Sequence, residues 1–250
     1  MTPSDQQPQR LDLALVARGL VATRAKARDL IARGEVRIDG EIVRKPAASV
    51  RDEQTIAVDA QAAAQVSRGA VKLTTALDRF GLDPAGRVSL DVGASTGGFT
   101  QVLLERGAAR VYAVDVGQGQ LHETLKDDPR VVALEQCDAR TLDRALVPNA
   151  VGAIVADVSF ISLTKVLPAA LALAATECWI VALVKPQFEV GREGVGKGGI
   201  VRDPEQRDRA LTTARDWLAA QPQWKVIGDM PSPIEGGSGN VEYLLAGIRT

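Results

Sequence analysis

Apolar and polar positions divide the chain into a short front part and a longer part with a repeating pattern. From Val88 to Val184, five short apolar runs recur with helical patterns between them: Val88–Val92, Val111–Val114, Val131–Leu134, Gly152–Ala156 and Trp179–Val184. Strands that alternate with helices predict a parallel sheet covered on both faces. Two more apolar runs, near Lys225–Met230 and Glu242–Ile248, flank a segment rich in Gly, Pro and Ser. They are expected to form an antiparallel pair that closes one sheet edge.

The front part has shorter elements. A first helix begins at Leu11 and ends at Gly19, and a second spans Arg24–Ala32. Short strands follow, with Asp39-Gly40 as a hairpin turn, and the last strand lies near Thr55–Val58. This order of elements predicts a small α+β domain.

The 250-residue chain is long enough for such a module of about 50 residues and a core of roughly 180. We expect an α/β fold class with a Rossmann-like seven-stranded sheet in the larger domain. The predicted organisation is a disordered N-terminus at 1–9, the α+β domain at 10–58, a linker at 59–66 and the α/β domain at 67–250.

Charge is distributed unevenly, although the net charge is only −1. Residues 9–51 hold ten basic and five acidic side chains, so this segment carries +5 and the remainder −6. A basic module beside a near-neutral body predicts binding to a polyanion, while a solvated helix face is the alternative. The candidate phosphate-binding residues are Arg10, Arg18, Arg24, Lys26, Arg28, Arg33, Arg37 and Lys45.

The few cysteines and histidines argue against a disulfide framework and against a zinc site. Cys137 and Cys178 lie far apart, and His122 is the only histidine. We therefore expect no metal, and reduced thiols in the cytoplasm. The apolar stretch Leu167–Val184 is broken near Glu177, which favours a buried helix followed by a buried strand over a membrane span. No apolar leader segment is seen at the N-terminus, and no membrane partner is expected.

The most informative motif is the turn after the first strand of the sheet, D-V-G-A-S-T-G-G-F-T at 91–100. Glycines at a first βα turn let the backbone approach a ligand and leave helix N–H groups free. The spacing differs from the G-x-G-x-x-G of dinucleotide enzymes. A carboxylate at the strand end suits a cofactor with an ammonium and a sulfonium, so the motif predicts S-adenosylmethionine. The candidate residues are Asp91, Gly93, Ser95, Thr96, Gly97, Gly98 and Phe99.

Two further acids support this interpretation. Asp115 ends the second strand some 20 residues after the glycines, where a ribose diol would be held. Asp138 follows the third strand and could accept a hydrogen bond from an adenine amine. Each acid alone is typical of a surface loop or a helix cap. Together with the glycine turn, they favour S-adenosylmethionine over NAD or a nucleotide.

The methyl acceptor is less directly indicated. The fourth strand ends in A-D-V-S-F at 156–160, without the Asn/Asp-Pro-Pro-aromatic run of amino-group methyltransferases. Cys137 and Cys178 are expected in the core rather than as nucleophiles. Lys185 follows the buried run W-I-V-A-L-V, where partial desolvation makes its neutral form more accessible for taking a proton from a sugar hydroxyl. The alternative is a cation that merely ends a strand.

The sequence resembles the TlyA (hemolysin A) family of ribosomal RNA 2′-O-methyltransferases, whose catalytic domain is shared with FtsJ-type enzymes. Nearly the whole chain is covered. The run RLDLALVARGLVATRAKARDLIARGEVRIDG is similar to an S4-type RNA-binding domain. The segments that look like motifs of the family are SRGAVKL, DVGASTGGFT, YAVDVGQGQL, CDAR, ADVSFISL, LVKPQFE and GNVEYLL.

The resemblance implies a catalytic set of Lys72, Asp157, Lys185 and Glu242. In it, Lys185 is the base, Asp157 and Lys72 orient it and the ribose hydroxyl, and Glu242 completes the network. Asp157 also belongs to the cofactor site. The implied substrate is a cytidine ribose in ribosomal RNA, with ribosomal RNA or ribosomal subunits as partners and a monomeric protein.

Two other functions stay open from sequence. One is a membrane-lytic protein, as the older family name implies, which a liposome-leakage assay would detect. The other is a non-catalytic RNA-binding factor in ribosome assembly, which would transfer no label from tritiated cofactor. The glycine-rich segment Gly191–Gly199 is either a loop that folds over RNA or cofactor, or a tolerated surface loop.

Overall fold

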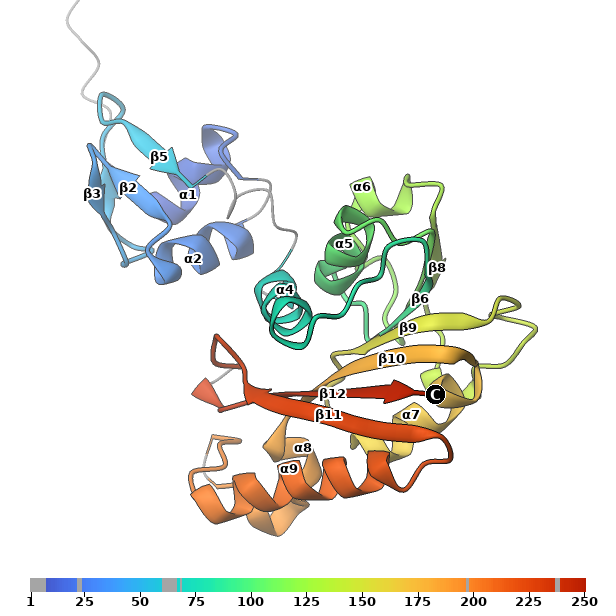
Figure 1. Cartoon of the computed structure of the whole chain (residues 1–250). Helices are drawn as coiled ribbons and strands as arrows, with labels where there is room; N and C mark the ends of the chain where they lie inside the picture. The colour runs from blue at the N-terminus through green and yellow to red at the C-terminus, as the bar shows by residue number, and fades with distance from the viewer. Residues whose placement is uncertain (1–7, 22–23, 60–66, 68, 197, 237–238) are drawn as a thin grey trace, which may run out of the picture. The chain divides into compact units, whose positions relative to one another are not determined.

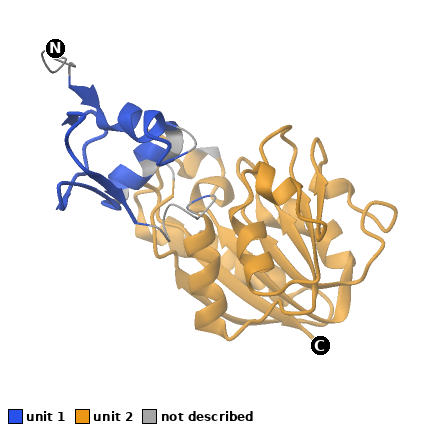
Figure 2. Cartoon of the chain, turned by 90° about the horizontal axis from the view of Figure 1, so that it is seen from above, with its two compact units in different colours: residues 1–67 blue, residues 68–250 orange. Residues whose placement is uncertain are grey.

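In the computed structural model the chain forms two compact units, residues 1–67 and residues 68–250 (Figure 2). The structure describes residues 8–21, 24–59, 67, 69–196, 198–236 and 239–250, without the side chains of residues 25, 26, 29, 33 and 192. The expectations for residues 1–7 and 60–66 lie outside the described residues. Each unit has its own buried apolar cluster and is described by itself.

The smaller unit packs two helices against short antiparallel strands. Its elements are β1 (Gln9–Arg10), α1 (Leu11–Ala17), α2 (Arg24–Arg33), β2 (Val36–Ile38), β3 (Glu41–Ile42), β4 (Ser49–Val50) and β5 (Ile56–Val58). Strand β2 lies between β3 and β5, and β1 pairs with β4. Gln9 pairs with Val50, so the expected disorder of residues 1–9 is wrong at this residue. The pairing is favoured because Val50 is buried in the core of the unit.

The predicted hairpin turn is present between β2 and β3. Asp39 and Gly40 have φ values of 50° and 88°, the two positive values that a tight turn matching the twist of a hairpin requires. The Asp39 carboxylate accepts hydrogen bonds from the Thr55 N–H at 2.9 Å and from Gln54 Nε2 at 2.8 Å. One aspartate therefore forms the turn and attaches it to the start of β5.

The larger unit is a seven-stranded sheet, which confirms the predicted fold class. Its strands are β6 (Val88–Val92), β7 (Arg110–Val114), β8 (Val131–Leu134), β9 (Val151–Ala156), β10 (Ala174–Val184), β11 (Trp224–Pro231) and β12 (Tyr243–Arg249). The order across the sheet is β11-β12-β10-β9-β6-β7-β8. Strand β12 is antiparallel to both β10 and β11, as expected for a pair that closes one edge.

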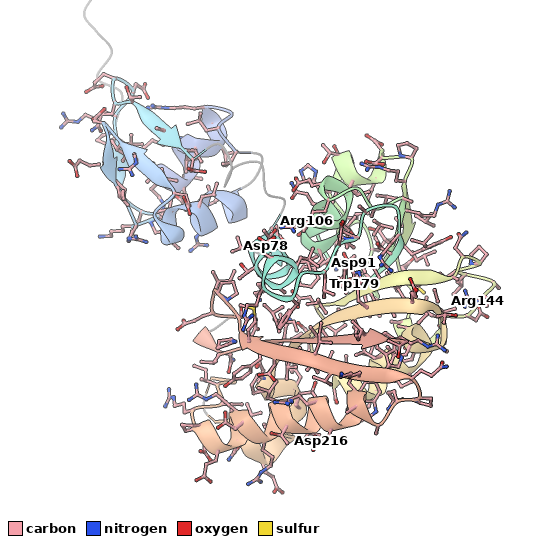
Figure 3. The ribbon with its side chains drawn as sticks, viewed as in Figure 1. Asp78, Asp91, Arg106, Arg144, Trp179 and Asp216 are labelled. Carbon is pink, nitrogen blue, oxygen red and sulfur yellow. The ribbon has the colours of Figure 1, made fainter. Side chains whose placement is uncertain are left out.

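Helices cover both faces of this sheet, with α4 and α5 on one face and α7 and α9 on the other (Figure 1). The helical elements are α4 (Gly69–Phe80), α5 (Gly98–Glu105), α6 (Glu123–Lys126), η1 (Ala139–Thr141), α7 (Leu163–Ala172), α8 (Pro186–Glu189), η2 (Arg192–Gly194) and α9 (Pro204–Ala219). An ion pair of 2.7 Å between Asp78 and Arg106 joins the end of α4 to the end of α5 (Figure 3).

Strand β10 corrects one expected boundary. The polar break at Thr176 and Glu177 does not separate a helix from the strand, because β10 already begins at Ala174. The two polar side chains are exposed, and the pairing of β10 with β9 is irregular between Ala174 and Trp179. The strand therefore accommodates the polar residues by a local irregularity at the end of the sheet, where water can reach them.

Candidate active site

Sheet register brings Asp157, Lys185 and Glu242 of the predicted catalytic set to the same end of the sheet. Val184 pairs with Tyr243, so Lys185 and Glu242 leave β10 and β12 at the same place. In the parallel pairs, Ala156 lies beside Ala182 and Val92, so Asp157 leaves β9 at that end as well. Carboxyl ends of adjacent parallel strands are the usual position of ligand sites in open α/β sheets.

Lys185 and Asp157 form the first of two ion pairs at this end of the sheet. The Lys185 Nζ lies 2.6 Å from Asp157 Oδ1 and donates a hydrogen bond to Ser159 Oγ at 3.1 Å. The Lys185 side chain is 12% exposed, which agrees with the desolvation expected from its position after a buried strand. The ammonium group is therefore held by two residues of the loop after β9.

Lys72 and Glu242 form the second ion pair. Lys72 lies on α4, and its Nζ donates to Glu242 Oε2 at 2.5 Å, with both side chains almost completely buried. Burial makes a pair of this kind costly to break, because either charge would be left without a partner. The predicted set is thus arranged as two pairs. Lys72 contacts Glu242, whereas Asp157 is the residue that holds Lys185.

A pocket of about 450 Å³ opens at the carboxyl ends of β6, β7, β8 and β9, within the size range of small-molecule sites. Its wall contains five of the ten residues predicted to bind the cofactor: Gly93, Ser95, Asp115, Asp138 and Asp157. The remaining wall is mainly apolar, with Val92, Val114, Val116, Val158, Ile161 and Val166. Lys185 and Arg140 pair with Asp157 and Asp138, so Asp115 is the carboxylate of this wall without an ion pair among the described residues.

Asp91 lies in the interior, at the end of β6 (Figure 3), rather than on the pocket wall. Its Oδ2 accepts a hydrogen bond of 2.7 Å from Thr100 Oγ1 on α5, while Oδ1 is buried without a partner among the described residues. Burial raises the pKa of Asp91 to about 7, against the effect of the Thr100 hydrogen bond, and the carboxylates of Asp157 and Asp115 raise it further. A cation beside Oδ1 would favour the ionised form.

The glycine turn is held from two sides. Asp115 accepts from the Ser95 N–H at 2.8 Å and from the Gly117 N–H at 2.7 Å, so the end of β7 fixes the middle of the turn. Gly97 has a φ of 98°, and a methyl group there would overlap Leu125 on α6. Of the other residues predicted in this turn, Thr96 is exposed, and Gly98 and Phe99 are buried at the start of α5. They shape the turn from outside the pocket wall.

Gly93 joins the cofactor turn to the loop that carries Asp157. Its φ is 85°, and a Cβ atom there would lie 2.5 Å from the main-chain oxygen of Asp157. The Asp157 N–H in turn donates to the Val92 carbonyl at 3.0 Å. The backbone after β6 and the backbone after β9 are therefore in direct contact, which only a residue without a side chain permits.

Asp138 lines the pocket but is already paired. Arg140 approaches its carboxylate to 2.5 Å, and the Arg140 N–H donates to Asp138 Oδ1 at 2.9 Å. These hydrogen bonds lower the pKa of Asp138 to about 2. Arg140 lines the pocket as well, so the predicted adenine contact is an ion pair rather than a lone carboxylate.

Two pocket features were missed by sequence reasoning. Phe160 is 90% exposed at the pocket with a φ of 66°, and its ring centroid lies 5.1 Å from that of Phe188. Glu135 accepts from the N–H groups of Gly119 and Gln120 and so fixes the loop that brings Gln120 to the pocket. A single phenylalanine or glutamate in a loop carries no spacing signal that would have identified either one.

Both cysteines have free thiols and contact the core, as expected. Burial raises the pKa of Cys178 to about 12, as for a core residue. Cys137 is only partly buried and also lines the pocket, where it directly precedes Asp138.

In the smaller unit, the predicted phosphate-binding residues differ in what their side chains contact. Arg10 and Arg24 lie 3.0 and 2.9 Å from the buried Asp12, and Arg28 is 4.0 Å away. Arg18 instead donates to the carbonyls of Gln54 and Arg51 within the unit. Arg37 and Lys45 are exposed. The side chains of residues 26 and 33, predicted to contact phosphate, lie outside the described part.

Comparison with known proteins gives consistent matches. A family model described as FtsJ-like methyltransferase matches residues 65–249, and one described as S4 domain matches residues 9–56. The 16S/23S rRNA (cytidine-2′-O)-methyltransferase TlyA of Mycobacterium tuberculosis is 52% identical over 239 residues, 94% of this chain and 88% of that protein. Hemolysin A of Brachyspira hyodysenteriae is 41% identical, with 94% and 98% covered.

A solved structure named "Putative hemolysin" from Streptococcus thermophilus matches with a TM-score of 0.73 and 38% identity, covering 98% of this chain and 89% of that one. Among the helices of the described residues, none combines the length and the apolar character needed to cross a membrane.

Proposed function

The chain belongs to the FtsJ-like methyltransferase family, and we propose that it methylates the 2′-oxygen of a cytidine ribose in ribosomal RNA, with S-adenosylmethionine as the methyl donor. Relatives from Mycobacterium tuberculosis and Campylobacter jejuni are named rRNA (cytidine-2′-O)-methyltransferases, and the matched S4 domain supports an RNA partner. A ribosomal substrate places the activity in the cytoplasm.

The observation that carries the proposal is the position of Lys185. Its Nζ lies 2.6 Å from Asp157, and Asp157 forms part of the pocket wall. S-adenosylmethionine supplies a methyl group on a positively charged sulfur atom. With the cofactor bound, Lys185 in its neutral amine form would take up the proton that the ribose 2′-hydroxyl releases when its oxygen is methylated. Asp157 and Ser159 hold the amine in place, and positioning of this kind supplies much of the rate.

The pocket residues fit the proposed cofactor. The unpaired Asp91 Oδ1 is a buried acceptor next to the glycine turn, as an ammonium requires. Asp115 lies at the end of β7, where a ribose diol would be bound, and its oxygens also hold the turn. The Asp138–Arg140 pair offers both an acceptor and donors to the edge of a base.

RNA is recognised, in this proposal, through phosphates and an exposed aromatic ring. Arginines of the smaller unit that surround Asp12 bind phosphate without reading sequence. Phe160 presents an almost fully exposed ring at the mouth of the pocket, and such rings stack on unpaired nucleobases. The Lys72–Glu242 pair lies at the same end of the sheet and orients the acceptor ribose.

The test is methyl transfer from tritiated cofactor to purified ribosomal subunits, followed by mapping of ribose methylation in each RNA. We expect label at one or a few cytidine 2′-oxygens, absent when the protein is omitted. Label on a base or on no RNA would overturn the proposal. A liposome-leakage assay on the same preparation tests the membrane-lytic alternative, for which dose-dependent leakage is the diagnostic result.

A further inference from the structure

Asn240 connects two glycine-rich segments that are far apart in the sequence. It is 3% exposed and lies shortly before β12. Its Oδ1 accepts from the Val201 N–H at 3.1 Å, and its Nδ2 donates to the Gly199 carbonyl at 2.9 Å. Both ends of one buried amide are therefore used to bind the backbone at the end of the 191–199 loop.

The other glycine-rich segment, which contains Gly236 and Asn240, lies directly against the carboxylate of Glu242. The Gly236 N–H donates to the Asn240 carbonyl at 2.9 Å, which closes a turn just ahead of Glu242. A methyl group at Gly236 would overlap the Glu242 carboxylate, so the turn and the carboxylate are in close contact. The Ser232 N–H also donates to the Glu242 carbonyl at 2.8 Å. The Asn240 main chain thus holds the backbone beside Glu242, and the Asn240 side chain anchors residue 240 itself to Gly199 and Val201.

The chemistry at position 240 is specific to an amide. Asparagine presents its donor and its acceptor on two separate atoms and keeps both at every pH, whereas a serine or threonine hydroxyl donates and accepts through one oxygen. An aspartate could accept from Val201 but, when ionised, would face the Gly199 carbonyl without a proton to share. It would also add a second carboxylate close to Glu242, in a region where unpaired charge is costly.

We propose that Asn240 is a positioning residue that holds Glu242 against Lys72 and so fixes the group that orients the acceptor ribose. The link to the ribose rests on the proposed function. Through the same amide, the end of the 191–199 loop is coupled to the Lys72–Glu242 pair.

Methyl transfer is the first readout. Asn240→Ala should lower kcat about 5- to 100-fold, the range expected for the loss of buried hydrogen bonds, with the cofactor Kd unchanged. Gly236→Ala, which presses on Glu242 without altering Asn240, should lower kcat in the same way. The matched control is Asn149→Ala, which removes the acceptor for the Tyr112 hydroxyl near the opposite end of β9 and should leave kcat unchanged.

Asn240→Asp adds a readout that loss of structure alone would not change. A protonated carboxyl has one donor and one acceptor, as the amide has, so lowering the pH should bring this variant closer to the wild-type rate. Asn240→Ala should show no such recovery. Equal rates for Asn240→Asp and wild type across the pH range would overturn the proposal.

A measurement without RNA separates this proposal from the proposed function. Lys72 is 7% exposed, and an amine-acylating reagent followed by mass spectrometry should modify it several-fold faster in Asn240→Ala, while the exposed Lys165 reacts at its wild-type rate. Unchanged Lys72 reactivity together with wild-type kcat would sink the positioning role. Faster Lys72 modification in a protein that methylates no RNA would instead support the positioning role and reject the proposed function.

Discussion

Among the described side chains, each unit contains one completely buried aspartate, and the two have opposite electrostatic surroundings. Asp12 in the smaller unit is covered by Arg10, Arg24 and Arg28, whose side chains are 44% to 61% exposed. Hydrogen bonds, first from Arg10 and then from Arg24, lower the pKa of Asp12 to about 2. Asp91 in the larger unit has one hydroxyl partner, and burial raises its pKa to about 7.

The difference shows that burial alone does not determine the state of a carboxylate. Asp12 is compensated by the protein's own cations and gathers three partly exposed guanidinium groups, to which the proposed function assigns phosphate binding. Asp91 lacks a cation among the described residues, and one of its oxygens has no hydrogen-bond partner there. We interpret the first as a device for presenting positive charge and the second as a site prepared for a positively charged ligand.

The largest effect is expected on the activity of the larger unit, from the substitution Lys185→Ala. Removing a group that moves a proton in the transition state should lower kcat by about 10²- to 10⁴-fold, with little change in the affinity for RNA or cofactor. Single-turnover transfer of tritiated methyl groups measures the rate. Lys165→Ala, an exposed lysine on α7, is the control and should react normally. A Lys185→Ala enzyme with normal turnover would remove this residue from the mechanism.

The pH dependence of stability should differ in sign between the two aspartates. The pKa of Asp91 is about 7 in the folded protein and 3.8 as the reference, so ionisation destabilises the fold by roughly 4 kcal/mol. Relative to Asp91→Asn, the wild type should lose stability as pH rises from about 4 to 7. For Asp12, with a folded pKa of about 2, stability is present above pH 4 and is lost as pH falls toward 2.

Urea unfolding followed by tryptophan fluorescence checks the Asp91 part, because all three tryptophans lie in the larger unit. For Asp12, backbone amide exchange of the smaller unit is the appropriate measurement. If the free energies of unfolding of the wild type and of Asp91→Asn changed with pH in parallel, the Asp91 carboxylate could not be buried without a compensating cation.

Asp91→Asn should weaken cofactor binding about 10- to 100-fold, because a hydrogen bond to a charged group is replaced by one to a neutral amide. Isothermal titration calorimetry with S-adenosylmethionine measures the change. Ser89→Ala is a matched control on the same strand, since the Ser89 hydroxyl is buried and unpartnered among the described residues. Equal affinities for Asp91→Asn and Ser89→Ala would mean that Asp91 only supports the turn.

The smallest effect is expected in the arginine cluster. Arg24→Ala should lower RNA affinity several-fold and make the plot of log K against log salt less steep by about 0.7 to 0.9. Arg18→Ala should instead reduce the stability of the smaller unit and keep the slope, because its guanidinium binds backbone carbonyls. Filter binding at several salt concentrations distinguishes them. Identical slopes for the two variants would show that Arg24 contacts no phosphate.

Most of the fold could be predicted from the sequence, because its elements depend on local signals. Apolar runs bounded by helical patterns gave β6 and β8 with correct ends, and Asp39-Gly40 specified a hairpin through its backbone conformations. The start of β10 was missed, because exposed polar residues at a strand end resemble a loop when the neighbouring strand is not known.

The site could be predicted only in part from the sequence. Strand-end aspartates and Lys185 could be placed at one end of the sheet, since parallel strands share their direction. The pairing of Lys72 with Glu242 spans 170 positions and depends on how α4 packs, which no local pattern encodes. The burial of Asp91 away from the pocket wall depends on tertiary packing in the same way. The Asp138–Arg140 pair is local, with the two residues only two positions apart, and was overlooked.

The lack of a side chain at Gly93 constrains how this protein can evolve. Because the turn after β6 and the loop after β9 occupy one shared volume, a bulkier residue at this position would displace Asp157 and the turn together. The turn and the loop, which would bind the methyl donor and the methyl acceptor, therefore cannot change independently at this position. Variation in specificity is thus expected to arise at positions whose side chains do not meet the main chain of a second loop.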